Sequence, residues 1–132
     1  MSSNKNTAIT SGIVISAVSQ FEERYSSPDD GRFIFSYEIT IENRTSASIQ
    51  LLRRAWYIFD ASGEHRHVEG KGVVGEQPVI LPGKSFNYRS ACDLKSPFGS
   101  MKGEYIVMDL SDKRLINVAI PVFSLETPWI LN

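Results

Sequence analysis

The glycines between residues 70 and 75 form the one glycine motif of this chain whose spacing is typical of a ligand-binding site. Gly70, Gly72 and Gly75 satisfy the pattern G-x-G-x-x-G, and Lys71 lies between the first two. In a dinucleotide-binding fold these glycines follow a strand and open a helix, so that backbone N–H groups hold a pyrophosphate. Here residues 76–83 contain two prolines and β-branched residues, which disfavour a helix.

Two interpretations of this glycine segment therefore remain. The one we favour is a tight inter-strand loop, in which the glycines supply positive φ angles. In the other, the backbone N–H groups of Gly70, Gly72 and Gly75 form a concave anion site without a helix, and Lys71 adds a positive charge. That arrangement would bind a phosphate-containing molecule.

Both histidines of the chain and one glutamate could bind a divalent metal. His65, His67 and Glu69 alternate along a short segment, so that a strand would place all three side chains on one face. Imidazole and carboxylate groups are common ligands of divalent metals. Three ligands along one flat strand rarely converge on one ion without a second element, so we favour a solvated strand face.

The sequence contains no recognisable catalytic set. The G-x-S-x-G elbow and a cysteine–histidine pattern are both absent, and the carboxylates are scattered along the chain. The single cysteine, Cys92, falls in a strand pattern, where a buried and inert thiol is common. We therefore expect a protein that is not an enzyme and that holds no cofactor.

Charge and composition narrow the range of partners. The 132 residues include 14 basic and 15 acidic side chains, and this balance gives no electrostatic reason to expect a nucleic-acid or anionic membrane surface. No apolar run approaches the roughly 20 residues of a membrane helix, and the polar N-terminus does not resemble a signal peptide. With one cysteine and no internal disulfide, we expect a cytoplasmic protein that binds neither nucleic acid nor membrane.

About seven segments, most of which alternate apolar and polar residues with a period of two, predict the strands that position these residues. In the clearest, residues 33–41, apolar side chains at the odd positions alternate with mostly polar ones. Around Arg53 and Arg54 the alternation breaks, which indicates either a strand covered on both faces or a β-bulge. Pro121 predicts an edge or a strand end. The other predicted strands cover residues 13–21, 49–59, 64–69, 85–92, 105–110 and 115–123.

Together these strands predict an all-β protein. We expect an antiparallel β-sandwich of about seven strands, of the immunoglobulin-like or fibronectin type III-like class. Residues 1–8 predict a flexible N-terminal tail, because they are rich in polar residues, and residues 9–132 predict a single domain. Trp129 is the best candidate for an aromatic anchor to a partner protein, and exposed sheet edges offer a second route.

The chain resembles the ApaG family in several motifs, from about Ile9 to Asn132. The resemblance implies a fibronectin type III-like β-sandwich, and it places the family's glycine motif, for which pyrophosphate binding has been suggested, on Gly70, Gly72 and Gly75. The motifs that carry it are FIFSYEITIEN at 33–43, QLLRRAWYIFDASG at 50–63, GKGVVGEQPVILPGKSFNYRS at 70–90, GSMKGEYIVMD at 99–109 and IPVFSLETP at 120–128.

The resemblance also carries an expectation about function. ApaG proteins have no settled biochemical activity; their name reflects gene neighbourhoods shared with diadenosine tetraphosphate hydrolysis, and they are associated with cobalt and magnesium tolerance. Related domains in eukaryotic F-box adaptors and in a polymerase-delta-interacting protein resemble protein-binding modules. We therefore expect a non-catalytic interaction domain whose partner is another protein. The alternative is a small-ligand binder, with a phosphate-containing molecule at Gly70–Gly75 or a metal at His65, His67 and Glu69.

Overall fold

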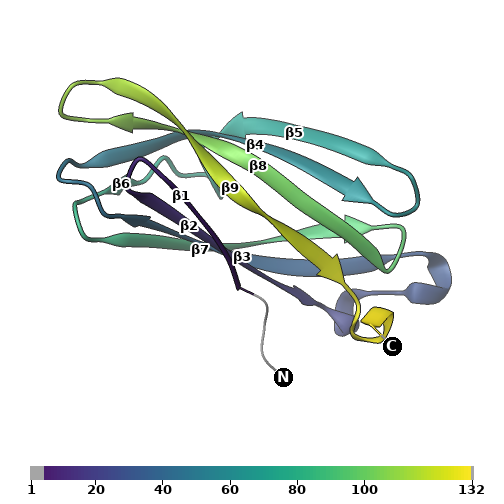
Figure 1. Ribbon diagram of the computed structural model, residues 1–132. Helices are drawn as coiled ribbons and strands as arrows, with labels where there is room; N and C mark the ends of the chain where they lie inside the picture. The colour runs from purple at the N-terminus through teal and green to yellow at the C-terminus, as the bar shows by residue number, and fades with distance from the viewer. Residues whose placement is uncertain (1–4, 132) are drawn as a thin grey trace.

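A computed structural model describes residues 5–131 and shows two antiparallel sheets packed face to face (Figure 1). The predicted antiparallel β-sandwich is thus confirmed, with nine strands in the described residues. One sheet has the order β1-β2-β3-β7; the other has the order β5-β4-β8-β9, and β6 pairs with β4. The strands are β1 (Lys5–Thr10), β2 (Ile13–Phe21), β3 (Phe33–Asn43), β4 (Ile49–Asp60), β5 (His65–Lys71), β6 (Val79–Ile80), β7 (Ser85–Leu94), β8 (Phe98–Asp109) and β9 (Arg114–Glu126).

The core lies between the two sheets, and alternation along each strand fills it. In β3 every odd-numbered residue is buried, while the even-numbered residues are partly or fully exposed. Tyr37 of this strand meets Trp56 of β4 and Phe123 of β9, with ring centroids 5.4 and 5.8 Å apart, and the rings of Trp56 and Phe123 lie 6.0 Å from each other. Tilted and edge-on aromatic pairs of this kind add stability beyond the area that they bury.

Strand β4 contains a bulge, which was one of the two alternatives for the broken alternation. Its pairing with β8 shifts register between Leu51 and Arg53. As a result the buried residues are odd-numbered before the bulge and even-numbered after it, as Trp56 and Ile58 show. The shift leaves Arg53 exposed and turns Arg54 toward the space between the sheets.

The N-terminal strand corrects the prediction of a tail over residues 1–8. Residues 5–8 belong to β1, which pairs with β2 from Lys5 opposite Val18 to Thr10 opposite Ile13. Residues 1–4 lie outside the described part of the chain. The mostly polar side chains of β1 give no strand pattern in the sequence. The strand forms because it pairs with the apolar β2 in a hairpin.

Strand β8 is much longer than predicted. It begins at Phe98, seven residues before the predicted strand over residues 105–110. A Cβ atom on Gly103 would overlap the carbonyl of Ala55 in β4, so this glycine allows a close approach of two strands. The partner strand β9 lies at the edge of its sheet, and Pro121 falls at a register shift there, as predicted.

Three short 3-10 turns are the only helical structure in residues 5–131: η1 (Glu23–Tyr25), η2 (Pro28–Asp30) and η3 (Pro128–Leu131). Among the residues placed, no helix has the length and apolar character needed to cross a membrane. In η3 the ring of Trp129 meets Phe21 edge-on with centroids 5.4 Å apart, and 47% of its surface stays exposed.

Candidate functional site

A groove of about 580 Å³ opens between the edges of β5 and β7. These two strands end their sheets on the side away from β1 and β9, which lie side by side in Figure 1. Three buried aromatic side chains, Tyr37, Trp56 and Tyr88, lie at the bottom. The walls hold the cations Arg54, Arg66 and Lys71, and residues 73–75 of the glycine loop close one end.

Arg54 occupies the groove because Gly70 leaves room for it. The two residues face each other across β4 and β5, and a Cβ atom on Gly70 would lie 2.7 to 2.8 Å from the guanidinium. Nη1 of Arg54 donates to the carbonyls of Lys71, at 3.1 Å, and Gly72, at 2.9 Å. The first glycine of the motif therefore accommodates an arginine side chain.

The other two glycines of the motif shape a tight turn. Gly72 has a φ of 66° and donates its N–H to the carbonyl of Leu52 at 2.8 Å. Val73 and Glu76 exchange two backbone hydrogen bonds around Val74 and Gly75, whose φ angles are 42° and 82°. Two successive positive φ angles are typical of a type I′ turn.

This geometry bears on the predicted phosphate site at Gly70, Lys71, Gly72 and Gly75. Of the four residues only Lys71, which is exposed, and Gly75 line the groove, whereas Gly72 is buried. The N–H of Gly72, however, is engaged within the protein. Phosphate binding by this loop stays a prediction.

The predicted metal ligands lie on the exposed face of β5. Nε2 of His67 is 2.9 Å from Oε2 of Glu69, and the imidazole stacks on Tyr57 at 4.5 Å between ring centroids. His65 instead tilts against Phe59 at 5.1 Å. The residues that the structure describes contain no cluster of three or more His, Cys, Asp or Glu side chains suited to a metal. The structure thus pairs His67 with Glu69, and metal binding stays a prediction.

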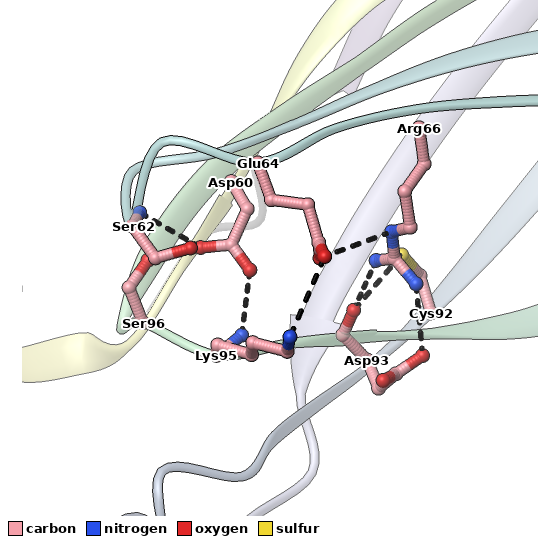
Figure 2. A network of polar contacts seen from close by, with 8 residues as sticks. All are labelled: Asp60, Ser62, Glu64, Arg66, Cys92, Asp93, Lys95 and Ser96. Atoms are coloured by element: carbon pink, nitrogen blue, oxygen red, sulfur yellow. Dashed lines mark hydrogen bonds and ion pairs between the residues drawn. The ribbon is translucent and has the colours of Figure 1, made fainter.

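A polar network joins β5 to β7 at the far end of the groove (Figure 2). Nη1 of Arg66 lies 3.2 Å from Oδ1 of Asp93, and Nη2 donates to the carbonyl of the same residue. Glu64 lies 3.9 Å from Nε of Arg66 and 3.4 Å from Nζ of Lys95. Arg66 thereby connects the two sheets where no strand pairing does.

The same network contains Asp60, the last residue of β4, which the sequence analysis did not single out as a site residue. Its carboxylate accepts hydrogen bonds from the N–H of Lys95 at 2.6 Å, from the hydroxyl of Ser96 at 2.6 Å and from the N–H of Ser62 at 3.0 Å. Asp60 is fully buried. The spacing Asp-x-Ser-Gly signals the contact with Ser62, but nothing local signals the contacts with residues 95 and 96.

Cys92 lies at the bottom of the groove beside Arg66, with Sγ 3.6 Å from Nη2. Burial raises the pKa of this thiol to about 11, although the charge of Arg66 opposes the shift. The buried cysteine predicted from the sequence is confirmed. At neutral pH the thiol is protonated.

We expect Cys92 to react with iodoacetamide at least about tenfold more slowly in the folded protein than in the protein unfolded in urea at the same pH. A two-unit rise in pKa lowers the thiolate fraction about 100-fold, partly offset by the greater nucleophilicity of the more basic thiolate. The rate is measured by mass spectrometry of the alkylated protein. Equal rates in the two states would contradict a buried, protonated thiol.

Comparison with known proteins places these features in a family. A family model described as the ApaG domain matches residues 23–109. A protein named ApaG from Anaeromyxobacter dehalogenans (strain 2CP-1) is 45% identical over 96% of this chain and 99% of its own length. A protein named ApaG from Proteus mirabilis (strain HI4320) is 42% identical over 93% of this chain and 98% of its own length.

Two solved structures share the fold. The X-ray structure of a Northeast Structural Genomics Consortium target has a TM-score of 0.85 and 39% identity, over 92% of this chain and 91% of its own. The crystal structure of a protein described as ApaA, from Bordetella pertussis, has the same TM-score and 32% identity, over 89% of this chain and 94% of its own.

Proposed function

This chain belongs to the ApaG family, and we propose that it is a non-catalytic protein-interaction domain whose contact surface is the groove between β5 and β7. The observation that carries the proposal is that two strand edges border one groove. Among the described strands, β5 pairs with β4 alone and β7 pairs with β3 alone. An extended segment of a partner can add to such an edge through main-chain hydrogen bonds.

The opposite side of the sandwich is less suited to strand addition, because side chains already occupy its backbone groups. Nδ2 of Asn6 donates to the carbonyl of Val122 at 2.7 Å. The N–H of Ala119 donates to the hydroxyl of Thr10 at 3.2 Å. These contacts join β1 to β9, whereas on the other side the groove separates β5 from β7.

The lining of the groove suits a peptide. Val68 and Val74 are 41% and 54% exposed at its rim, although both are apolar. Arg54, Lys71 and Ser90 offer polar contacts beside them. Apolar anchors next to a few polar groups are typical of surfaces that recognise a partner.

The chemistry of the groove supports the non-catalytic part of the proposal. Asp93 is paired with Arg66, and the thiol of Cys92 is protonated at neutral pH. The two histidines lie on the outer face of β5, against aromatic side chains of β4. In the part of the chain described, the groove thus offers no unpaired general base. A cytoplasmic location is part of the proposal, supported by the single free cysteine.

Photo-crosslinking from the groove tests the proposal. We expect p-benzoylphenylalanine incorporated at Val68 to crosslink a defined protein in cells, and an excess of unlabelled wild-type protein to abolish the product. The matched control carries the same residue at Val122, an exposed valine of comparable accessibility on the edge strand β9. Products that are the same from both positions, or no protein product from Val68 in a folded variant, would contradict the proposal.

A further inference from the structure

We propose that the partner segment carries a carboxylate side chain, which binds the guanidinium of Arg54 inside the groove. This inference rests on the proposed function, since it names the chemistry of the segment that the groove receives. It adds a binding residue that the glycine motif and the histidines did not indicate.

Arg54 is a half-buried cation whose donors are only partly used. Its Nη1 donates to the two backbone carbonyls of Lys71 and Gly72. Within residues 5–131 no carboxylate forms an ion pair with it, whereas Arg66 in the same groove has both Asp93 and Glu64. A guanidinium carries five N–H groups in a planar fork, and the fork matches the two oxygens of a carboxylate.

The charges around Arg54 favour an anion. The groove is lined by three cations, Arg54, Arg66 and Lys71, and by one carboxylate, that of Asp93. Since Arg66 is paired with Asp93 and Glu64, the excess of positive charge lies on Arg54 and Lys71, in contrast to the formal net charge of -1 for the whole chain. An acidic side chain entering the groove would thus be attracted to it.

The hydroxyl groups below Arg54 are neutral. Burial raises the pKa of both Tyr37 and Tyr88, and the charge of Arg54 opposes each shift without reversing it. The hydroxyl of Tyr88 forms a hydrogen bond of 2.5 Å with that of Tyr105. These tyrosines therefore add no negative charge to compete for the guanidinium.

The apolar rim distinguishes an acidic peptide from a small free anion. Val68 and Val74 line the groove on the side of β5 and the glycine loop, close in the fold to Arg54. An extended segment would place an acidic residue on Arg54 and apolar neighbours against these valines. A free phosphate would leave both valines uncovered, and the N–H of Gly72 is already engaged.

An NMR titration of the isotope-labelled full chain tests this inference. The probes are two blocked tripeptides, acetyl-Val-Glu-Val-amide and acetyl-Val-Gln-Val-amide, and inorganic phosphate in a third series. We expect the Glu peptide to shift the Nε–Hε signal of Arg54 and the amide of Ser90 saturably, and added salt to weaken the effect. The Gln peptide should bind at least about tenfold more weakly.

Matched variants locate the effect. Arg54→Gln should lower the affinity for the Glu peptide by about tenfold or more, while Arg53→Gln, which changes the exposed neighbour on the other face, should leave it unchanged. If Arg54→Gln does not fold, the comparison of the two peptides on the wild-type chain and the rim variant Lys71→Gln decide the matter. Lys71→Gln should weaken binding of the Glu peptide alone.

Several outcomes would overturn the inference. Equal binding of the two peptides would do so, as would shifts at Arg54 with phosphate but none with the Glu peptide. If Val68 crosslinks a protein but the Glu and Gln peptides bind equally, the inference of a carboxylate on Arg54 is overturned and the proposed function stands. Glutamate-dependent shifts at Arg54 with no crosslinked protein would support the carboxylate site and contradict the proposed function instead.

Discussion

Replacing Asp60 by alanine is expected to lower the free energy of unfolding by roughly 3–5 kcal/mol. The carboxylate is fully buried and accepts three hydrogen bonds, from Ser62, Lys95 and Ser96. Its removal takes the acceptor from the N–H groups of Ser62 and Lys95 at a partly buried site, while the hydroxyl of Ser96 keeps the carbonyl of Phe98 at 2.8 Å. Polar groups that lose their partner away from water are costly. The lost hydrogen bonds lie at the end of the groove, where Figure 2 shows the hairpin after β4 held against residues 95 and 96.

Urea denaturation at several pH values measures this effect and its sign. Burial acts to raise the pKa of Asp60, but the hydrogen bonds from Lys95, Ser96 and Ser62 outweigh it and lower the pKa below its ordinary value of 3.8. The ionised carboxylate therefore stabilises the fold at pH values above the pKa that this carboxyl has in the unfolded chain. This contribution is lost as the pH falls through its pKa in the folded protein.

The variant Asp60→Asn should accordingly be less stable than wild type at neutral pH and should lose less stability on acidification. The exposed Asp29 provides the control, because Asp29→Asn removes a carboxylate that accepts none of these bonds. If Asp60→Asn is as stable as wild type at neutral pH, or loses as much stability as wild type at acidic pH, the network does not depend on the charge of Asp60.

Replacing Gly72 by alanine is expected to destabilise the protein by roughly 2–4 kcal/mol. The φ angle of 66° strains any residue that has a Cβ atom, and this Cβ atom would also overlap the backbone carbonyl of Glu76. The turn that closes the groove would have to open to relieve the overlap. A simple loss of ligand affinity on an intact fold is therefore not the expected result.

Gly75→Ala is the matched control in the same motif. Its φ angle of 82° is also positive, but nothing lies within 4 Å of the added Cβ atom, so the cost should be only about 1 kcal/mol. Chemical denaturation of both variants measures the difference. Equal and small effects at the two positions would show that the turn does not require these glycines and would favour a ligand-binding reason for the motif.

The sandwich itself could be predicted from the sequence, because it depends on a local signal. Successive side chains of a strand point to opposite faces, so the alternation in β2 and β3 shows both the strand and the face that it buries. The broken alternation around Arg53 offered a bulge in β4 as one of two alternatives, and the register shift of this strand decides between them. The motifs that resemble the ApaG family also lie along the chain, and they could be read without a structure.

The tertiary structure decided where these residues meet. Strand β1 carries no strong pattern of its own and owes its order to pairing with β2. Two of the three partners of Asp60 lie 35 and 36 residues away. Arg54 enters the groove only because a bulge reverses its face and a glycine lies opposite. Such contacts depend on the register between strands distant in the chain, which is set by the packing of the whole core and by no short stretch of sequence.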